Sequence, residues 1–127
     1  MFSHVTIGTN DFDRAIKFYD AVLGTLGHER FYTGDGYAGY GAPNDNQVWV
    51  MHPYDGNRAT AGNGTHIAFL APDRESVRRF HAAALANGGS DEGGPGQRPH
   101  YHPNYYGAYV RDPEGIKLQA VCHRPAD

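Results

Sequence analysis

Hydrophobic and polar residues alternate at the start of this chain and again at the start of its second half. The first alternating segment is Phe2–Gly8 and the second is Thr65–Leu70. A period of two is typical of a β-strand with one buried face, so we expect a strand at each place. His4 and His66 fall on the polar face of their strands. The apolar side chains on the opposite face are Val5, Ile7, Ile67 and Phe69.

Each predicted strand is followed by apolar residues at helical spacing. The first helix is expected to begin after a cap at Asn10 or Asp11 and to reach Leu26. The second is expected to begin after Asp73 and to be closed by Gly88. A short side-chain oxygen at the cap accepts a hydrogen bond from a free N–H group of the first turn. The apolar positions then predict two amphipathic helices, each with one face toward a core.

Short β-rich segments separated by turn residues follow each helix. The predicted strands are His28–Thr33, Tyr37–Tyr40, Gln47–His52, Tyr105–Arg111 and Ile116–Cys122. Gly88–Pro103 is rich in glycine and proline, and we expect one irregular short strand and a mobile loop there. Tyr54–Asn63 links the two halves. Each half is therefore predicted to have the order βαβββ.

The two halves also share residues in one register. His66 lies 62 residues after His4, and the same offset continues through the strand and the helix without a gap. Further matching pairs are Asp11 with Asp73, Phe18 with Phe80, Ala21 with Ala83, and Leu23 with Leu85. Such self-similarity indicates an internal repeat. We predict an α+β fold in a single domain over residues 1–127, with module 1 at about 1–55 and module 2 at about 63–124.

The composition excludes several partners and compartments. Eleven basic and fourteen acidic residues give a net charge of −3 with no basic run, which argues against nucleic acid. The longest apolar stretches, such as Val48–Met51, fall far short of the roughly 18 residues of a membrane-spanning helix. The chain shows no apolar signal-peptide core, so a cytoplasmic location is expected. Its one cysteine, Cys122, excludes an internal disulfide and is expected to be a buried thiol.

Two βαβββ copies with a histidine at the same place in each first strand resemble the vicinal oxygen chelate superfamily. That group includes glyoxalase I, extradiol dioxygenases, and bleomycin- and fosfomycin-resistance proteins. The segments that carry the resemblance are Ser3–Ile7, Asp13–Tyr19, Gly64–Phe69, Asp112–Gly115 and Lys117–Val121. The resemblance implies a curled mixed sheet that forms an incomplete cup, with the helices on its outer face. It also implies a divalent metal in the cup that chelates two neighbouring substrate oxygens.

The resemblance further implies that His4, His66 and Gln119 hold this metal, which would be Zn²⁺, Ni²⁺, Mn²⁺ or iron. Gln119 stands where the superfamily usually has a glutamate. An amide oxygen can coordinate, but it has no charge and accepts no proton, which argues against ring-cleaving dioxygenase chemistry. The alternative is that no metal binds, and that the two histidines and Gln119 are hydrogen-bonded polar residues that line the cup.

Other candidate residues lie in two segments. In the second half, His102 or Tyr105 would transfer a proton, and His100 and Tyr106 would contact a substrate. An ordinary surface loop is the alternative for this segment. In the first half, one strand face carries an apolar pair that would form either a wall of the cup or part of the core. These two residues are Trp49 and Met51.

Two functions follow from these observations. The first is a metal-dependent enzyme with glyoxalase-like lyase or isomerase chemistry, in which the metal acts as a Lewis acid on a small oxygen-chelating substrate. The second is a metal-free protein that binds and sequesters a small molecule, like the bleomycin-resistance proteins. We expect a homodimer in either case, because such a cup leaves sheet edges to cover. The sequence leaves open whether the modules pair within one chain or between two.

Overall fold

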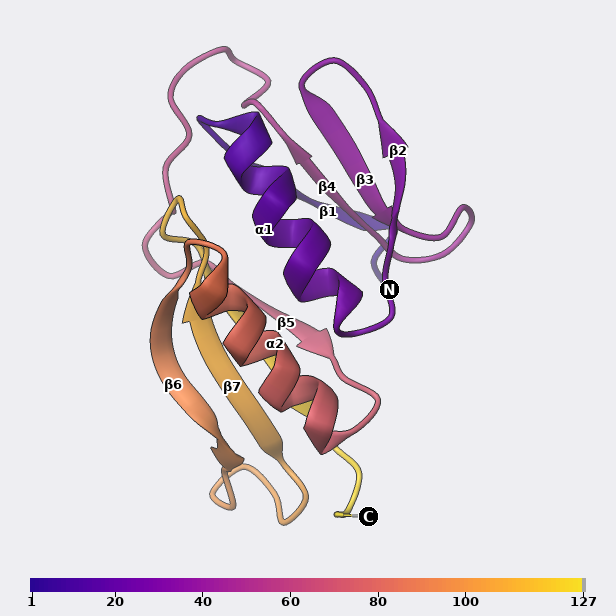
Figure 1. Ribbon diagram of the computed structural model, residues 1–127, viewed down its shortest axis with the longest axis vertical. Coiled ribbons are helices and arrows are strands. Elements are labelled where there is room, and N and C mark those ends of the chain that lie inside the picture. Colours follow the sequence, from indigo (N-terminus) through magenta and orange to yellow (C-terminus); the bar gives the residue numbers. More distant parts are fainter. Residues whose placement is uncertain (127) are drawn as a thin grey trace.

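The computed structural model describes residues 1–126, in which two four-stranded sheets are covered by two helices (Figure 1). The first module consists of β1 (His4–Gly8), α1 (Phe12–Gly24), β2 (Arg30–Thr33), β3 (Tyr37–Gly41) and β4 (Gln47–Met51). The second consists of β5 (His66–Leu70), α2 (Arg74–Ala86), β6 (Ser90–Gln97), β7 (Tyr106–Arg111) and β8 (Lys117–Cys122). The predicted βαβββ order of each half is confirmed.

The two sheets have the same topology. Their strand orders are β1-β4-β3-β2 and β5-β8-β7-β6, and in each sheet the first strand runs parallel to the last while the other pairs are antiparallel. The ladders begin at matching places, since His4 lies opposite Gln47 and His66 lies opposite Lys117. The strand expected to be short and irregular is β6. It is irregular, with two register shifts against β7, but it spans eight residues.

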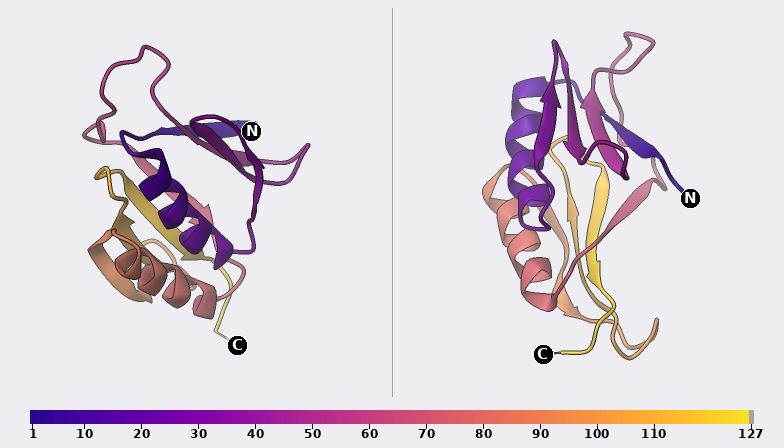
Figure 2. Two further views of the ribbon diagram at one scale, coloured as in Figure 1. Left: turned by 45° about the horizontal axis from the view of Figure 1, so that its top comes forward. Right: turned by 90° about the vertical axis from the view of Figure 1, so that its right-hand side faces the viewer.

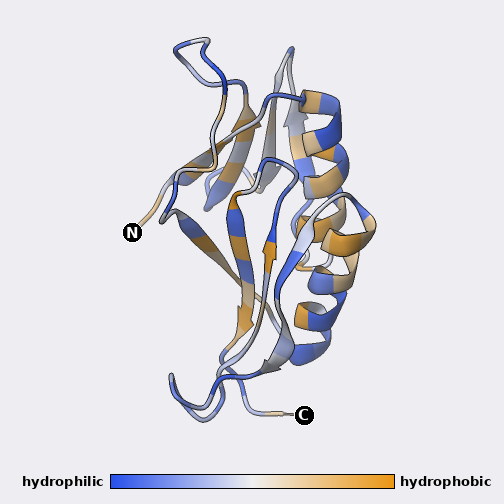
Figure 3. Cartoon of the chain, turned by 90° about the vertical axis from the view of Figure 1, so that its left-hand side faces the viewer, coloured by the Kyte–Doolittle hydropathy of each residue, from blue (hydrophilic) through white to orange (hydrophobic). Residues whose placement is uncertain are grey.

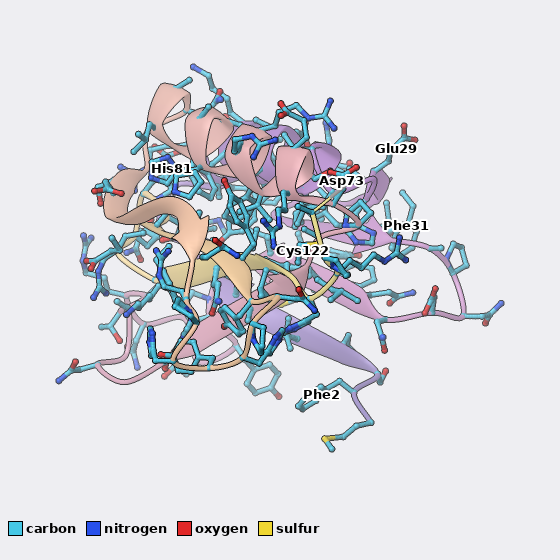
Figure 4. The ribbon with its side chains drawn as sticks, turned by 90° about the horizontal axis from the view of Figure 1, so that it is seen from below. Phe2, Glu29, Phe31, Asp73, His81 and Cys122 are labelled. Carbon is cyan, nitrogen blue, oxygen red and sulfur yellow. The ribbon has the colours of Figure 1, made fainter. Side chains whose placement is uncertain are left out.

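Both helices begin where the sequence predicts. Asp11 caps α1 by accepting a hydrogen bond from the backbone N–H of Arg14, and Asp73 caps α2 in the same way from Ser76 (Figure 4). The helices lie side by side on one side of the sheets (Figure 2). Their apolar stripes face the strands (Figure 3). The fully buried side chains between helices and sheets include Phe18, Leu23, Phe80 and Leu118.

The apolar and polar residues of β1 and β5 lie on opposite faces of their strands, as the alternation predicts. Ile7 is buried, and Ile67 and Phe69 pack against the core, whereas His4 and His66 are exposed on the opposite face. That opposite face, the concave face of each sheet, carries no helix, and β1 and β5 each form one edge of their sheet. The buried thiol expected at Cys122 is confirmed (Figure 4). No helix within residues 1–126 combines the length and the apolar character that crossing a membrane requires.

A carboxylate joins the two modules. Glu114, in the turn between β7 and β8, accepts hydrogen bonds from Asn10 through both its backbone N–H and its side-chain amide, each at 2.9 Å. Thr9 and Arg14 donate to it as well, at 3.2 Å and 2.8 Å. Burial raises the pKa of Glu114, but these hydrogen bonds outweigh burial and hold the pKa below its ordinary value. The start of α1 is thereby fixed to the second sheet.

Candidate functional site

The concave face of the second sheet brings together two of the three predicted metal ligands, His66 and Gln119. In the parallel ladder Lys117 lies opposite His66 and Gln119 opposite Ala68, so these side chains share one face. Burial lowers the pKa of His66, the nearby Lys117 ammonium lowers it further, and a hydrogen bond with Gln119 acts in the opposite direction. The imidazole is therefore neutral at pH 7.

Gln119 is covered rather than open to a ligand. Only 2% of the residue is exposed, and its side-chain amide nitrogen donates a hydrogen bond to the Tyr105 hydroxyl. Gly107 leaves room for this pair, because a Cβ there would lie 3.2 Å from the Gln119 amide nitrogen and 3.4 Å from the Tyr105 ring. Tyr105, predicted to transfer a proton, accepts this hydrogen bond and holds the Gln119 amide in place.

Three basic side chains surround the Tyr109 ring on the same face. The Lys117 ammonium lies 5.3 Å and the Arg98 guanidinium 5.5 Å from the ring centroid, and the His66 ring lies 5.7 Å from it. We call Tyr109 with His66, Arg98 and Lys117 the Tyr109 cluster. Burial and a hydrogen bond with Tyr105 raise the pKa of Tyr109 to about 12, so its phenol stays protonated at neutral pH. None of Tyr109, Arg98 and Lys117 was predicted as a site residue, although the alternation along β7 and β8 places Tyr109 and Lys117 on this face.

His102 is hydrogen-bonded to a histidine that the sequence analysis did not select. Its Nε2 lies 2.8 Å from Nδ1 of His123. The backbone N–H of Asn104 donates to His102 Nδ1 at 3.1 Å, so Nδ1 is the acceptor and the proton of the neutral ring sits on Nε2. His100, predicted to contact a substrate, packs against Tyr101 with ring centroids 4.2 Å apart.

Tyr106 lies on the other side of the sheet, apart from the site predicted for it. The Arg78 guanidinium donates to its hydroxyl at 3.1 Å, and the Arg74 guanidinium lies 5.0 Å from its ring centroid. Both arginines belong to α2, so Tyr106 packs between the second sheet and its helix. Side chains alternate along a strand, and Tyr105 and Tyr106 therefore point to opposite faces.

The third predicted ligand, His4, belongs to the other sheet. It is exposed on β1, and its Nδ1 lies 2.8 Å from the Ser3 hydroxyl. Within residues 1–126, no three His, Cys, Asp or Glu side chains converge in a way that suits a metal ion. A single chain therefore brings His66 and Gln119 together but does not add His4.

The concave face of the first sheet carries an aromatic platform, which we define as Phe31, Tyr32, Tyr37 and Trp49. Tyr32 and Tyr37 stack with centroids 5.5 Å apart, and both lie near Trp49, at 5.8 Å and 6.4 Å. Phe31 (Figure 4) meets the Trp49 ring edge-on at 5.7 Å. The indole lies over Gly39, where a Cβ would come within 2.9–3.0 Å of three ring atoms. The partly buried Trp49 and Met51 share this face, and the other three aromatic residues were not predicted.

The ladders also show that Trp49 and Gln119 occupy equivalent positions. Trp49 lies opposite Thr6, two residues beyond His4, and Gln119 lies opposite Ala68, two residues beyond His66. Neither sheet thus places a carboxylate at this position. Gln119 is buried and bound to Tyr105, and an ammonium stands beside His66. As a donor set these residues do not fit a resident divalent cation, because they offer no charged ligand, the Gln119 amide is covered, and the neighbouring ammonium repels a cation.

In one chain the concave faces are open surfaces rather than enclosed cavities. A hollow of about 480 Å³ lies between the end of α1 and β2, and its lining includes Asp20, His28 and Arg30. It contains none of the site residues predicted from the sequence, but Phe31 and Tyr32 of the aromatic platform also line it. The chemistry on the concave faces consists of hydrogen-bond donors, cations and aromatic rings, which suit recognition of a small molecule.

Comparison with known proteins places this architecture in a family. Residues 1–120 match the model of the Glyoxalase/Bleomycin resistance protein/Dioxygenase superfamily. A glyoxalase/bleomycin resistance protein from Albidiferax ferrireducens is 41% identical, with a TM-score of 0.88 over 98% of this chain and 99% of that one. No curated protein matches the sequence.

More distant solved structures share the fold. A lactoylglutathione lyase from Agrobacterium tumefaciens is 20% identical, with a TM-score of 0.66 over 96% of this chain and 92% of that one. A fosfomycin resistance protein from Mesorhizobium loti is 17% identical, with a TM-score of 0.65 over 96% and 91%. At these identities the likeness concerns the fold alone, because one fold supports many activities.

Proposed function

Since this chain belongs to the Glyoxalase/Bleomycin resistance protein/Dioxygenase superfamily, we propose that it binds a small planar aromatic molecule without a metal ion. The ligand lies between the aromatic platform of one sheet and the Tyr109 cluster of another. Of the two functions expected from the sequence, this is the metal-free one.

The observation that carries the proposal is the state of Gln119. Its side chain is buried, its amide nitrogen donates to Tyr105, and its amide is also hydrogen-bonded to His66. An amide coordinates through its oxygen, so a metal would have to displace the contact with His66 and uncover the side chain. The equivalent position of the first sheet holds Trp49. An indole offers a ligand ring stacking and apolar contact instead of a metal bond.

The aromatic platform supports the same function. Its outer members are exposed, with 37% of Phe31, 44% of Tyr32 and 39% of Tyr37 accessible. Large aromatic side chains gathered on an open face are typical of a binding site, because burying them under a ligand removes apolar surface from water. Gly39 keeps the Trp49 ring flat against the strand, so the platform is formed before a ligand arrives.

A second copy of the chain completes the site. No strand within residues 1–126 pairs with the outer edge of β1 or of β5. Leu70, at the end of β5, has 68% of its surface exposed. Since β1 and β5 are repeats of one element, a twofold axis can set β1 of one copy along β5 of the other. Each cup then combines the first sheet of one protomer with the second sheet of its partner.

Trp49 makes this proposal testable, because it is the only tryptophan in the chain. We take 2-naphthoate as the probe and titrate it by isothermal calorimetry in a buffer with a chelator. We expect a dissociation constant of roughly 10 µM to 1 mM, as for ligands of this size, with quenching of Trp49 fluorescence. Trp49→Leu should weaken binding about tenfold. Tyr54→Leu is the matched control on a fully exposed aromatic residue, and it should bind like the wild type. Absence of binding, or equal binding by both variants, contradicts the proposal.

A further inference from the structure

We propose that the ligand of this site is an anion, an aromatic carboxylate or phenolate, whose charged end is bound by Lys117 and Arg98 of the Tyr109 cluster. The inference rests on the proposed function and adds the chemical class of the ligand to it.

Both cations lie against the Tyr109 ring. They are within cation–π range of its centroid, Lys117 at 5.3 Å and Arg98 at 5.5 Å. The ring attracts each cation but does not neutralise its charge. An anion that binds at this ring is therefore attracted by both positive charges.

Neither cation has a carboxylate partner within residues 1–126. The Arg98 guanidinium donates only to the backbone carbonyls of Gly94 and Gln97, and the Lys117 ammonium forms no hydrogen bond in the same part of the chain. Arg111, the cross-strand neighbour of Lys117, differs because Glu92 neutralises it. Although the whole chain carries a net charge of −3, this face therefore has uncompensated positive charge.

Partial burial strengthens the attraction between these two cations and an anion. Lys117 and Arg98 are half-buried, so water screens them less than it screens exposed lysines and arginines. The hydroxyl of Tyr109 stays protonated at neutral pH because burial and Tyr105 raise its pKa to about 12. A neutral phenol adds no negative charge beside the cations. Two uncompensated cations at one aromatic ring form a binding site for a carboxylate or phenolate oxygen.

The test compares two probes of equal shape and different charge, 2-naphthoate and the neutral 2-naphthamide, by calorimetry in a chelating buffer. Wild-type protein should bind the naphthoate at least tenfold more tightly. Lys117→Met and Arg98→Met should each weaken naphthoate binding about fivefold to twentyfold and change naphthamide binding less than twofold. Lys117→Arg keeps the charge and should restore most of the affinity that Lys117→Met loses. Lys17→Met and Arg79→Met remove the same charges from exposed positions on the helices, and they should bind both probes like the wild type.

The outcomes separate this inference from the function on which it rests. If both probes bind equally well, or if Lys117→Met weakens both to the same degree, the anion inference is wrong while aromatic binding stands. If neither probe binds to wild-type protein with an intact melting transition, the proposed function is wrong and the inference is overturned with it. If Lys17→Met weakens naphthoate as much as Lys117→Met does, the effect comes from net charge, and the assignment to the Tyr109 cluster is wrong.

Discussion

Replacing Gly39 by alanine should dismantle the aromatic platform without unfolding the protein. A Cβ at this position would come within 2.9–3.0 Å of three atoms of the Trp49 ring. Real Cβ contacts of this length are essentially never seen, so the indole must leave the strand. Tyr32 and Tyr37, which lie 5.8 Å and 6.4 Å from that ring, then lose their packing partner.

The size of the loss in stability depends on where the Trp49 indole can move. Overpacking a closed core costs about 1–3 kcal/mol, but Trp49 is only partly buried and can swing toward solvent. We therefore expect a loss of about 1 kcal/mol in the free energy of unfolding. Loss of one aromatic stacking contact is worth about 1–1.5 kcal/mol, so naphthoate affinity should fall about tenfold.

Two measurements check this prediction, and both use the single tryptophan. The Trp49 emission of Gly39→Ala should shift to longer wavelength as the indole becomes solvated, and calorimetry should show the tenfold loss. Gly24→Ala is the matched control, because a Cβ there meets nothing within 4 Å, and it should leave emission and affinity unchanged. Unchanged emission together with unchanged affinity in Gly39→Ala would refute the platform as the binding surface.

Three further predictions concern single side chains. Glu114→Gln should lower the free energy of unfolding by about 2–4 kcal/mol at pH 7, since it weakens four hydrogen bonds to a largely buried carboxylate. The pKa of Glu114 is lowered in the fold, so the stability that this carboxylate contributes is present above its ordinary pKa of 4.5 and is lost as the pH falls through the folded pKa. In urea titrations, the free energies of unfolding of wild type and variant should therefore converge in acid. Tyr105→Phe should cost about 1–3 kcal/mol in thermal and urea unfolding, because the buried Gln119 amide loses its acceptor, whereas the exposed control Tyr101→Phe should cost almost nothing. Gln119→Glu should change Zn²⁺ or Ni²⁺ affinity in calorimetry by less than about threefold, because residue 119 is covered by Tyr105; affinity at least tenfold tighter, with a pH dependence near carboxylate titration, would place residue 119 in a coordination shell.

The fold was predictable because local signals agree with one another along the chain. The alternation around His4 and His66, the caps at Asp11 and Asp73, and the offset between the halves all indicate the same repeat, and the observed strand order matches it. Such patterns depend on neighbours in sequence, which an inspection of the sequence can follow. The length of β6 was less clear, because its glycines and proline weaken any strand pattern.

The site was predictable only in part, since its properties depend on contacts between distant residues. Alternation places Gln119 on the concave face, but it cannot show that Tyr105 covers the amide. It likewise cannot show that Lys117 and Arg98 both lie against the Tyr109 ring. The position of Tyr106 on the helix side has a simpler explanation. Neighbouring aromatic residues were grouped by sequence, whereas a strand sends Tyr105 and Tyr106 to opposite faces.

The central claim is that the concave site recognises its ligand without a metal ion. The most direct measurement is a pair of calorimetric titrations of wild-type protein with 2-naphthoate, one in a buffer with a chelator and one with saturating Zn²⁺ or Ni²⁺. The two dissociation constants should agree within about twofold, because Lys117, Arg98 and the aromatic platform provide the contacts. Binding that appears only with the metal, or that strengthens tenfold or more with it, would contradict the claim and would indicate that His66 and Gln119 serve a metal centre.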